Sequence, residues 1–152
     1  MSDVLFICHG NACRSPMAAG LLEVELDRLA GPDHGFVVES AGLAVVEGCP
    51  PNQQAVAAAA EWGLDMRGHR SRQLTPEMAG RAERIFCMEP GQVEATRKVN
   101  PEARAELLGD GVEDPTGGRA AYDETLAKLR DLIAPLAESL VGETRGSASN
   151  QR

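Results

Sequence analysis

The chain has 152 residues, a net charge of −8 and four cysteines, and its length suffices for one domain with a single hydrophobic core. The acidic balance excludes nucleic acid as a general partner, and no apolar run is long enough to span a membrane. Because the cysteines show no Cys-x-x-Cys spacing and no secretory signal is present, we expect a reduced, cytoplasmic compartment.

Strand and helix patterns alternate along the chain, which predicts an α/β fold whose parallel sheet is covered on both faces. The predicted strands are 3–8, 36–40, 84–88 and 105–108. The predicted helices are 15–30, 52–62, a short one opening at 75, 90–99 and 120–141, the last with apolar residues every three or four positions. We expect a single domain over 1–141 and a disordered, Gly- and Ser-containing tail over 142–152.

The most informative segment follows the first strand and reads Cys8-His9-Gly10-Asn11-Ala12-Cys13-Arg14-Ser15-Pro16. A thiolate that attacks phosphorus needs positive surroundings, which the N–H groups of a tight loop and the start of a helix supply. Cys8 is therefore the candidate nucleophile, and the planar guanidinium of Arg14 can bind two phosphate oxygens. Gly10 and Asn11 tolerate the positive φ of such a loop, and Ser15 is predicted to cap the helix, with Pro16 at its first position.

The segment from Val4 to Ala18 resembles the signature of low-molecular-weight protein-tyrosine phosphatases, and similarity extends to about Leu132. The resemblance implies a three-layer sandwich with a four-stranded parallel sheet and a phosphate-binding loop between the first strand and the first helix. It also implies a hydrolase of protein phosphotyrosine that works through a cysteinyl-phosphate and needs no metal or cofactor. Ser15 would then help the Cys8 sulfur to leave as a thiolate, and the phosphate would be bound by His9, Gly10, Asn11, Ala12, Cys13 and Arg14.

An acid must protonate the leaving oxygen, and Asp114 is the best candidate. It lies in a Pro/Gly-rich loop after the last predicted strand, and loops that follow parallel strands share one edge of the sheet. The family has an Asp-Pro loop here, which implies that Asp114 is the general acid and then the base. His9, next to the nucleophile, could line the pocket, carry partial charge or simply face solvent at the rim.

The resemblance also implies support and regulation for the loop. Residues of the family at the places of Asn11, Ser40 and His69 hydrogen-bond to one another and hold the asparagine in its left-handed conformation. Family members with a second cysteine in the loop form a disulfide that protects the nucleophile, which implies redox regulation through Cys8 and Cys13.

Departures from the family pattern leave the substrate open. Tyrosine-specific members carry aromatic residues after the Asp-Pro pair and a bulky aliphatic residue before the second cysteine, where this chain has Thr116-Gly117 and Ala12. Protein-arginine phosphatases of the family have Thr at the place of Ala12, so this position favours neither subgroup. Arsenate reductases of the same fold need two further cysteines, and Cys87 has no such partner. A non-catalytic phosphate-binding or redox-sensing module is a further alternative, which the presence of Asp114 disfavours.

Overall fold

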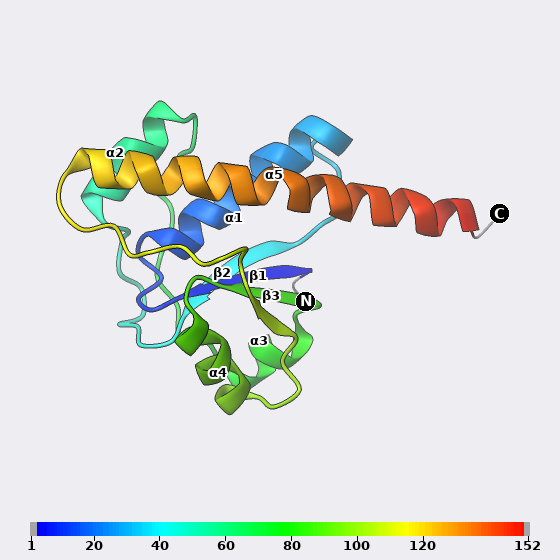
Figure 1. The fold of residues 1–152 in the computed structure, drawn as a ribbon, viewed down its shortest axis with the longest axis horizontal. Coiled ribbons are helices and arrows are strands. Elements are labelled where there is room, and N and C mark those ends of the chain that lie inside the picture. Colours follow the sequence, from blue (N-terminus) through cyan, green and yellow to red (C-terminus); the bar gives the residue numbers. More distant parts are fainter. Residues whose placement is uncertain (1–2, 151–152) are drawn as a thin grey trace.

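A four-stranded parallel sheet lies between two layers of helices in the computed structural model, which describes residues 3–150 (Figure 1). The strands are β1 (Val4–Cys8), β2 (Val38–Gly42), β3 (Arg84–Cys87) and β4 (Ala105–Leu107). The helices are α1 (Arg14–Ala30), α2 (Gln53–Glu61), α3 (Pro76–Arg81), α4 (Pro90–Val99) and α5 (Arg119–Asn150). The predicted three-layer α/β sandwich is confirmed.

The first strand of the chain occupies an inner position of the sheet, whose order is β2-β1-β3-β4. All five residues of β1 are buried, and they alternate between the two hydrophobic clusters on opposite faces of the sheet. At its carboxyl end Cys8 pairs with Gly42, and Ile7 pairs with Cys87. The loops that follow β1, β2 and β3 therefore leave the sheet at the same edge, which is where ligands bind in such sheets.

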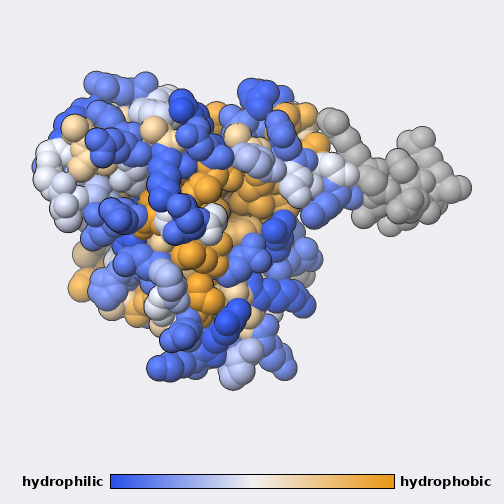
Figure 2. Space-filling view, viewed as in Figure 1, coloured by the Kyte–Doolittle hydropathy of each residue, from blue (hydrophilic) through white to orange (hydrophobic). Residues whose placement is uncertain are grey.

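The helices divide between the two faces of the sheet. Helices α1, α2 and α5 cover one face, and α3 and α4 cover the other (Figure 1). Leu22 and Leu26 of α1 pack with Leu126, Leu129 and Ile133 of α5, all fully buried. On the face shown in Figure 2, hydrophobic residues gather in a band beneath α5, and hydrophilic residues cover most of the rest. Among the described helices, none is long and apolar enough to cross a membrane.

Two predicted helix starts are confirmed at the level of single hydrogen bonds. Asn52 Oδ1 accepts from the backbone N–H groups of Gln54 and Ala55 at the start of α2. Thr75 Oγ1 accepts from Met78 N at the start of α3. Both caps satisfy N–H groups that have no partner inside the helix.

The predicted cap of α1 is wrong. The N-cap is Cys13, which makes no side-chain cap, and Ser15 lies inside the first turn. The physical reason is that the Ser15 hydroxyl is used elsewhere, in contacts with Cys8 and Asn11 across the loop.

Two element boundaries also differ from the sequence prediction. Strand β2 starts at Val38 rather than at residue 36, because Phe36 N donates to His34 Nδ1 instead of joining the sheet. Helix α5 continues past residue 141 to Asn150, and no proline follows to end it. The division into a domain over 1–141 and a tail over 142–152 stays a prediction, and its last two residues lie outside the described part of the chain.

Candidate active site

The loop between β1 and α1 turns on one residue in a left-handed conformation. Asn11 has φ of 55° and is fully buried, and it is the one non-glycine residue within 3–150 with a positive φ. A left-handed residue in a tight turn lets successive backbone N–H groups converge, as they do in anion-binding nests. The predicted positive φ is confirmed for Asn11 and not for Gly10, and the loop has the backbone geometry that a phosphate requires.

A chain of buried polar side chains connects the nucleophile to the second strand. Cys8 Sγ lies 3.0 Å from Ser15 Oγ. Asn11 Nδ2 donates to Ser15 Oγ at 2.8 Å and to Ser40 Oγ at 3.0 Å. Because Ser15 Oγ accepts from Asn11, its own hydroxyl hydrogen is free, and a Cys8 thiolate can only accept that hydrogen.

Segment 63–72 holds Asn11 from the other side. His69 Nε2 donates to Asn11 O at 2.8 Å, and Arg72 N donates to Asn11 Oδ1 at 3.0 Å. The structure therefore brings Ser40 and His69 to Asn11, as the family resemblance implies. The Arg72 contact was not predicted, since a backbone N–H leaves no trace in the residue types.

Arg14 is held in place by groups from two other loops. Its side chain is 4% exposed, and its Nη1 donates to Glu89 Oε2 and to Val112 O, both at 2.8 Å. Nε lies 3.6 Å from Asp114 Oδ1. Glu89 was not predicted as part of the site, although its place directly after β3, at the edge shared with Cys8, is a usable signal.

Asp114 reaches the phosphate loop from the segment between β4 and α5. Its side chain is 68% exposed, so the carboxyl group meets both Arg14 and solvent. Together with Cys8, His9 and Cys13 it lines a pocket of about 280 Å³. Sequence residues 8 and 114 are thus brought to one rim, and His9 is an exposed residue of that rim.

Two residues that were not predicted complete the pocket wall. Tyr122 of α5 and Asn52, the cap of α2, both line it. The backbone N–H of Asn52 also donates to Ala12 O at 3.1 Å. Burial, with Cys13 and Asp114 nearby, raises the pKa of Tyr122 above its ordinary value. In the sequence Asn52 is explained as a helix cap and Tyr122 as part of an apolar helix face. These local explanations conceal that both residues also line the pocket.

The two cysteines of the loop differ in environment. Both are free thiols, and Cys13 is half-buried with Sγ 4.0 Å from Met17 Sδ. Burial, followed by the proximity of Cys8 and Asp114, raises the pKa of Cys13 to about 12. Cys13 therefore remains a protonated thiol at neutral pH.

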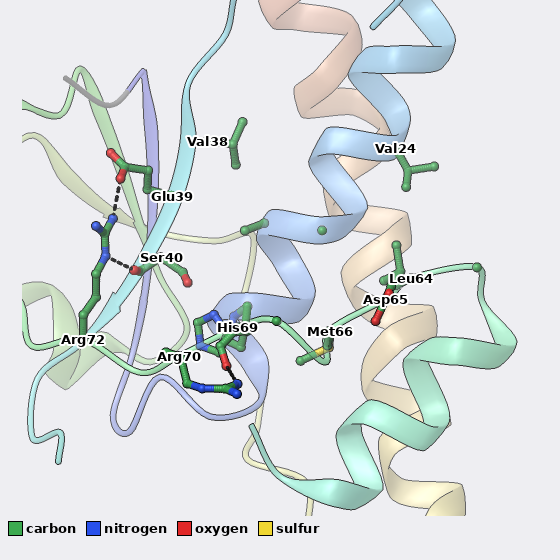
Figure 3. A pocket seen from close by; sticks show the side chains of 15 residues that line it. Val24, Val38, Glu39, Ser40, Leu64, Asp65, Met66, His69, Arg70 and Arg72 are labelled. Atoms are coloured by element: carbon green, nitrogen blue, oxygen red, sulfur yellow. Dashed lines mark hydrogen bonds and ion pairs between the residues drawn. The ribbon is translucent and has the colours of Figure 1, made fainter. Parts of the chain in front are cut away.

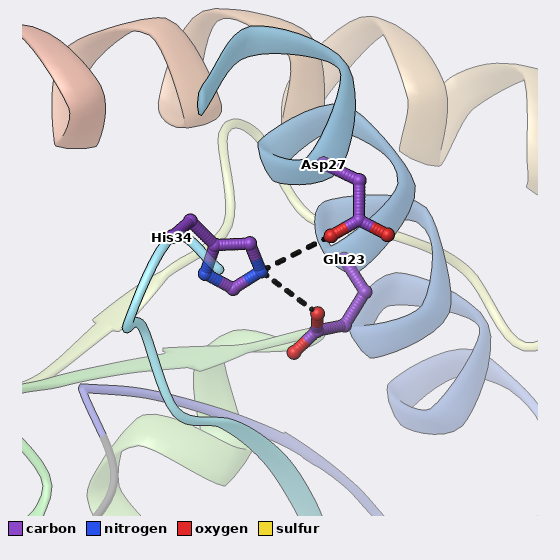
Figure 4. A group of neighbouring side chains, drawn as sticks. All are labelled: Glu23, Asp27 and His34. Atoms are coloured by element: carbon purple, nitrogen blue, oxygen red, sulfur yellow. Dashed lines mark hydrogen bonds and ion pairs between the residues drawn. The ribbon is translucent and has the colours of Figure 1, made fainter. Parts of the chain in front are cut away.

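A second polar cluster lies away from the loop, where Glu23 and Asp27 of α1 meet His34 (Figure 4). His34 Nε2 lies 3.1 Å from Glu23 Oε2 and 3.4 Å from Asp27 Oδ1. Since His34 Nδ1 accepts a hydrogen bond from Phe36 N, the ring proton is on Nε2, which points at the carboxylates. A nitrogen that carries a proton cannot bind a metal, so the cluster fastens the start of β2 to α1.

Fold and site together define the class of protein. A buried cysteine and a buried arginine lie at the two ends of one tight loop, at the carboxyl edge of a parallel sheet. This is the arrangement of an enzyme that binds phosphate through its loop and attacks phosphorus with sulfur.

The comparisons with known proteins identify the family. The family profile described as low molecular weight phosphotyrosine protein phosphatase matches residues 3–145. The chain therefore belongs to this family of hydrolases.

Two relatives and one solved structure illustrate the similarity. The probable low molecular weight protein-tyrosine-phosphatase EpsP of Ralstonia nicotianae is 37% identical over 137 residues, which covers 86% of this chain and 90% of that protein. The protein-arginine-phosphatase of Geobacillus stearothermophilus is 37% identical over 155 residues, covering 92% and 97%. The solved structure of the YwlE arginine phosphatase from the same organism aligns with a TM-score of 0.84 at 35% identity, covering 94% of this chain and 95% of that one.

Proposed function

We propose that this chain hydrolyses phosphate esters on proteins, with phosphotyrosine as the main substrate, through a cysteinyl-phosphate intermediate. The observation that carries the proposal is the convergence of Cys8, Arg14 and Asp114 on one pocket of about 280 Å³. They supply a nucleophile, an anion clamp and an acid, the three parts that this chemistry needs.

In the first step Cys8 Sγ attacks phosphorus and the bond from phosphorus to the tyrosine oxygen breaks. Asp114 donates its proton to that oxygen, so a neutral phenol leaves. Arg14 and the N–H groups of the loop bind the three non-bridging oxygens. Because Nη1 of Arg14 is already bound to Glu89 and Val112, the donors for phosphate are Nε and Nη2.

In the second step a water molecule attacks the phosphorus of the intermediate and the S–P bond breaks. The Asp114 carboxylate accepts a proton from that water, so the acid of the first step is restored. The Ser15 hydroxyl, 3.0 Å from Cys8 Sγ, donates to the sulfur as it leaves and stabilises the thiolate.

A second substrate, protein phosphoarginine, is favoured by a specific feature of the pocket. Tyr122 is the one Phe, Tyr or Trp side chain among the residues that line it, and Ala12 and Pro115 leave the other walls low. A phenyl ring gains less contact from such walls than from two flanking aromatic rings. The same alternative is supported by the 37% identity to the protein-arginine-phosphatase and by the 35% identity to the solved YwlE arginine phosphatase.

The remaining alternatives have less support. An arsenate reductase needs a relay of further thiols, and Cys87 is buried with Thr96 Oγ1 as its partner at 3.6 Å. A non-catalytic phosphate-binding or redox-sensing module would not need a carboxyl group at the mouth of the pocket, where Asp114 lies.

The experiment that tests the proposal compares three substrates under matched conditions: a phosphotyrosine peptide, a phosphoarginine peptide, and arsenate with a thiol reductant. We expect the highest kcat/KM on phosphotyrosine, and Cys8→Ser should abolish turnover while phosphate still binds. A strong preference for either of the other two substrates would overturn the substrate assignment, and turnover by Cys8→Ser would overturn the mechanism.

The partner is accordingly a phosphorylated protein, and the proposal excludes nucleic acid and membranes as partners. The net charge of −8 supports the first exclusion. A cytoplasmic location is part of the proposal, since the chemistry needs Cys8 as a free thiol and such thiols persist in a reducing compartment.

A further inference from the structure

A cleft of about 560 Å³ lies beside α1 (Figure 3), and none of its lining residues lines the pocket around Cys8. It is bounded by α1, by β2 and by the segment 63–72. Its volume is twice that of the pocket of about 280 Å³ around Cys8. A space of this size accommodates a small organic molecule.

One end of the cleft is aliphatic. Val24 and Val38 lie at the upper end in Figure 3, and Leu64 and Met66 follow along one side. Val24 is 45% exposed, an unusual degree for a large hydrophobic residue in this protein. A hydrocarbon chain lying here would remove apolar surface from water, which favours binding.

The other end of the cleft carries an uncompensated positive charge. The Arg70 guanidinium donates to the backbone oxygens of Arg67 and His69, and among the described residues no carboxylate lies within salt-bridge distance of it. The acidic side chains of the cleft already have cationic partners: Asp65 pairs with Arg67 at 2.9 Å and Glu39 with Arg72 at 2.6 Å. In a chain with a net charge of −8, this end of the cleft is suited to an anion.

The cleft and the phosphate loop share a wall. Ser40, His69 and Arg72 all line the cleft, and each of them also hydrogen-bonds to Asn11. They are the groups outside the loop and its helix that hold Asn11 in its left-handed conformation. A molecule in the cleft that orders these three residues therefore also stabilises the loop on its far side.

We propose that this cleft binds a small organic anion with an aliphatic body, and that its occupancy strengthens phosphate binding at the loop. The anionic group lies at Arg70, and the hydrocarbon lies against Val24, Val38 and Leu64. Coupling between two sites is reciprocal, so phosphate must strengthen binding of the anion by the same factor. The proposal concerns a site separate from the catalytic pocket, and its binding test does not depend on turnover.

The test uses octanoate as the probe and measures its binding by calorimetry, with acetate and octanol as the two half-probes. We expect octanoate to bind and both half-probes to bind at least roughly tenfold more weakly, because each lacks one of the two interactions. In the presence of inorganic phosphate, octanoate should bind more tightly. Displacement of octanoate by phosphate would place it in the catalytic pocket and overturn the proposal.

Two variants disable the two ends of the cleft separately. Arg70→Gln removes the positive charge and should weaken octanoate binding roughly tenfold. Gly20→Leu fills the cleft from α1, in which Gly20 lies. A Cβ at Gly20 would lie 3.7 Å from the Leu64 methyl groups, which is an ordinary van der Waals contact. It should weaken octanoate binding at least as much, and both variants should keep the basal kcat/KM on p-nitrophenyl phosphate.

Arg28→Gln is the matched control, because it makes the same charge change on α1 at an exposed residue paired with Glu25, outside the cleft. It should leave octanoate binding unchanged. If Arg70→Gln and Gly20→Leu also leave it unchanged, octanoate binds elsewhere and the site is wrong. If octanoate binds in the cleft without changing phosphate affinity, the coupling is wrong.

Discussion

Asn11 is the residue on which the geometry of the phosphate loop depends. Its side chain binds Ser15, Ser40 and the backbone of Arg72, and its carbonyl accepts from His69. Asn11 thus links Ser15, the hydrogen-bond partner of Cys8, to two other segments of the chain. It does so in a backbone conformation that most residues avoid. Conformation and hydrogen bonding can be separated by substitution.

Asn11→Gly and Asn11→Ala should both reduce kcat/KM, by roughly 10- to 100-fold, because the loop loses its side-chain contacts. Glycine adopts φ of 55° without strain, whereas alanine should lose a further ~1 kcal/mol of unfolding free energy. Urea unfolding and steady-state kinetics measure the two effects. Equal stability of the two variants would contradict the assigned role of the backbone conformation.

Asp114→Asn should lower kcat/KM, which reports the first step, by roughly 10²–10⁴ on phenyl phosphate, whose leaving group needs a proton. The loss of kcat/KM should be much smaller on p-nitrophenyl phosphate, because p-nitrophenolate leaves readily as an anion. KM should change little, since Asp114 is exposed and meets Arg14 only at 3.6 Å. An undiminished rate on phenyl phosphate would remove Asp114 from the mechanism.

Cys13→Ser tests the predicted redox role of the second cysteine. Peroxide oxidises the Cys8 thiolate to a sulfenic acid, and attack by Cys13 then forms the disulfide and releases water. In the unsubstituted protein dithiothreitol should restore activity, whereas Cys13→Ser should go on to irreversible oxidation.

The pKa of Cys13, about 12, adds a requirement to this role. Only the thiolate attacks. While the pH is below that pKa, each increase of one pH unit raises the thiolate fraction of Cys13 about tenfold, so disulfide closure should accelerate as the pH rises. Full recovery of peroxide-treated Cys13→Ser would contradict the role. Mass spectrometry of the oxidised peptides identifies the products.

At the scale of elements, the ends of β1 and β2 approach so closely that one position must be glycine. A Cβ at Gly42 would meet Val45 Cγ2, and it would lie 2.8 Å from His9 O and 3.0 Å from Asn11 N. The last two atoms are backbone of the phosphate loop, so they cannot move without moving the site. The sheet register that pairs Cys8 with Gly42 thus places the second strand directly behind the loop.

Gly42→Ala should therefore lower both stability, by roughly 1–3 kcal/mol, and kcat/KM. Gly91→Ala in α4 is the matched control, because nothing lies within 4 Å of its added Cβ and alanine favours a helix. The control should be neutral or stabilising. If Gly42→Ala behaved like Gly91→Ala in denaturation and kinetics, the close approach would not constrain the loop.

At the scale of the whole molecule, folding buries two thiols whose ionised forms it disfavours. Burial is the main cause that raises the pKa of Cys13 to about 12 and that of Cys87 to about 11, from an ordinary 9.0. At a pH between the ordinary pKa of 9.0 and the raised pKa of each thiol, that thiol is protonated in the folded chain and ionised in the unfolded chain. The free energy of unfolding must therefore fall as pH rises above 9.

Urea unfolding at pH 8 to 10.5 should show this decrease, with a slope approaching 1.4 kcal/mol per pH unit for each thiol. Cys13→Ser and Cys87→Ser should each reduce the slope, because serine has no proton to release in this range. A variant that changes the unfolding free energy equally at every pH, without changing the slope, would contradict the raised pKa of that thiol, since a change in packing alone produces that result.

The sequence by itself determined the alternation of strands and helices, the helix starts at Asn52 and Thr75, and the phosphate loop from Cys8 to Arg14. These features are local: period, capping and loop chemistry are each contained within a few consecutive residues. Asp114 was also within reach, because a parallel sheet brings the loops after its strands to one edge.

Only the tertiary structure decided which distant groups complete the site. Glu89 fixes Arg14, Asn52 and Tyr122 form the pocket wall, and the hydroxyl of Ser15 faces the sulfur instead of capping a helix. Each depends on how β3, α2 and α5 lie against the loop, and the same residue types satisfy ordinary local roles. Long-range packing decides which of those roles a residue has, and a local sequence pattern carries no information about contacts between distant residues.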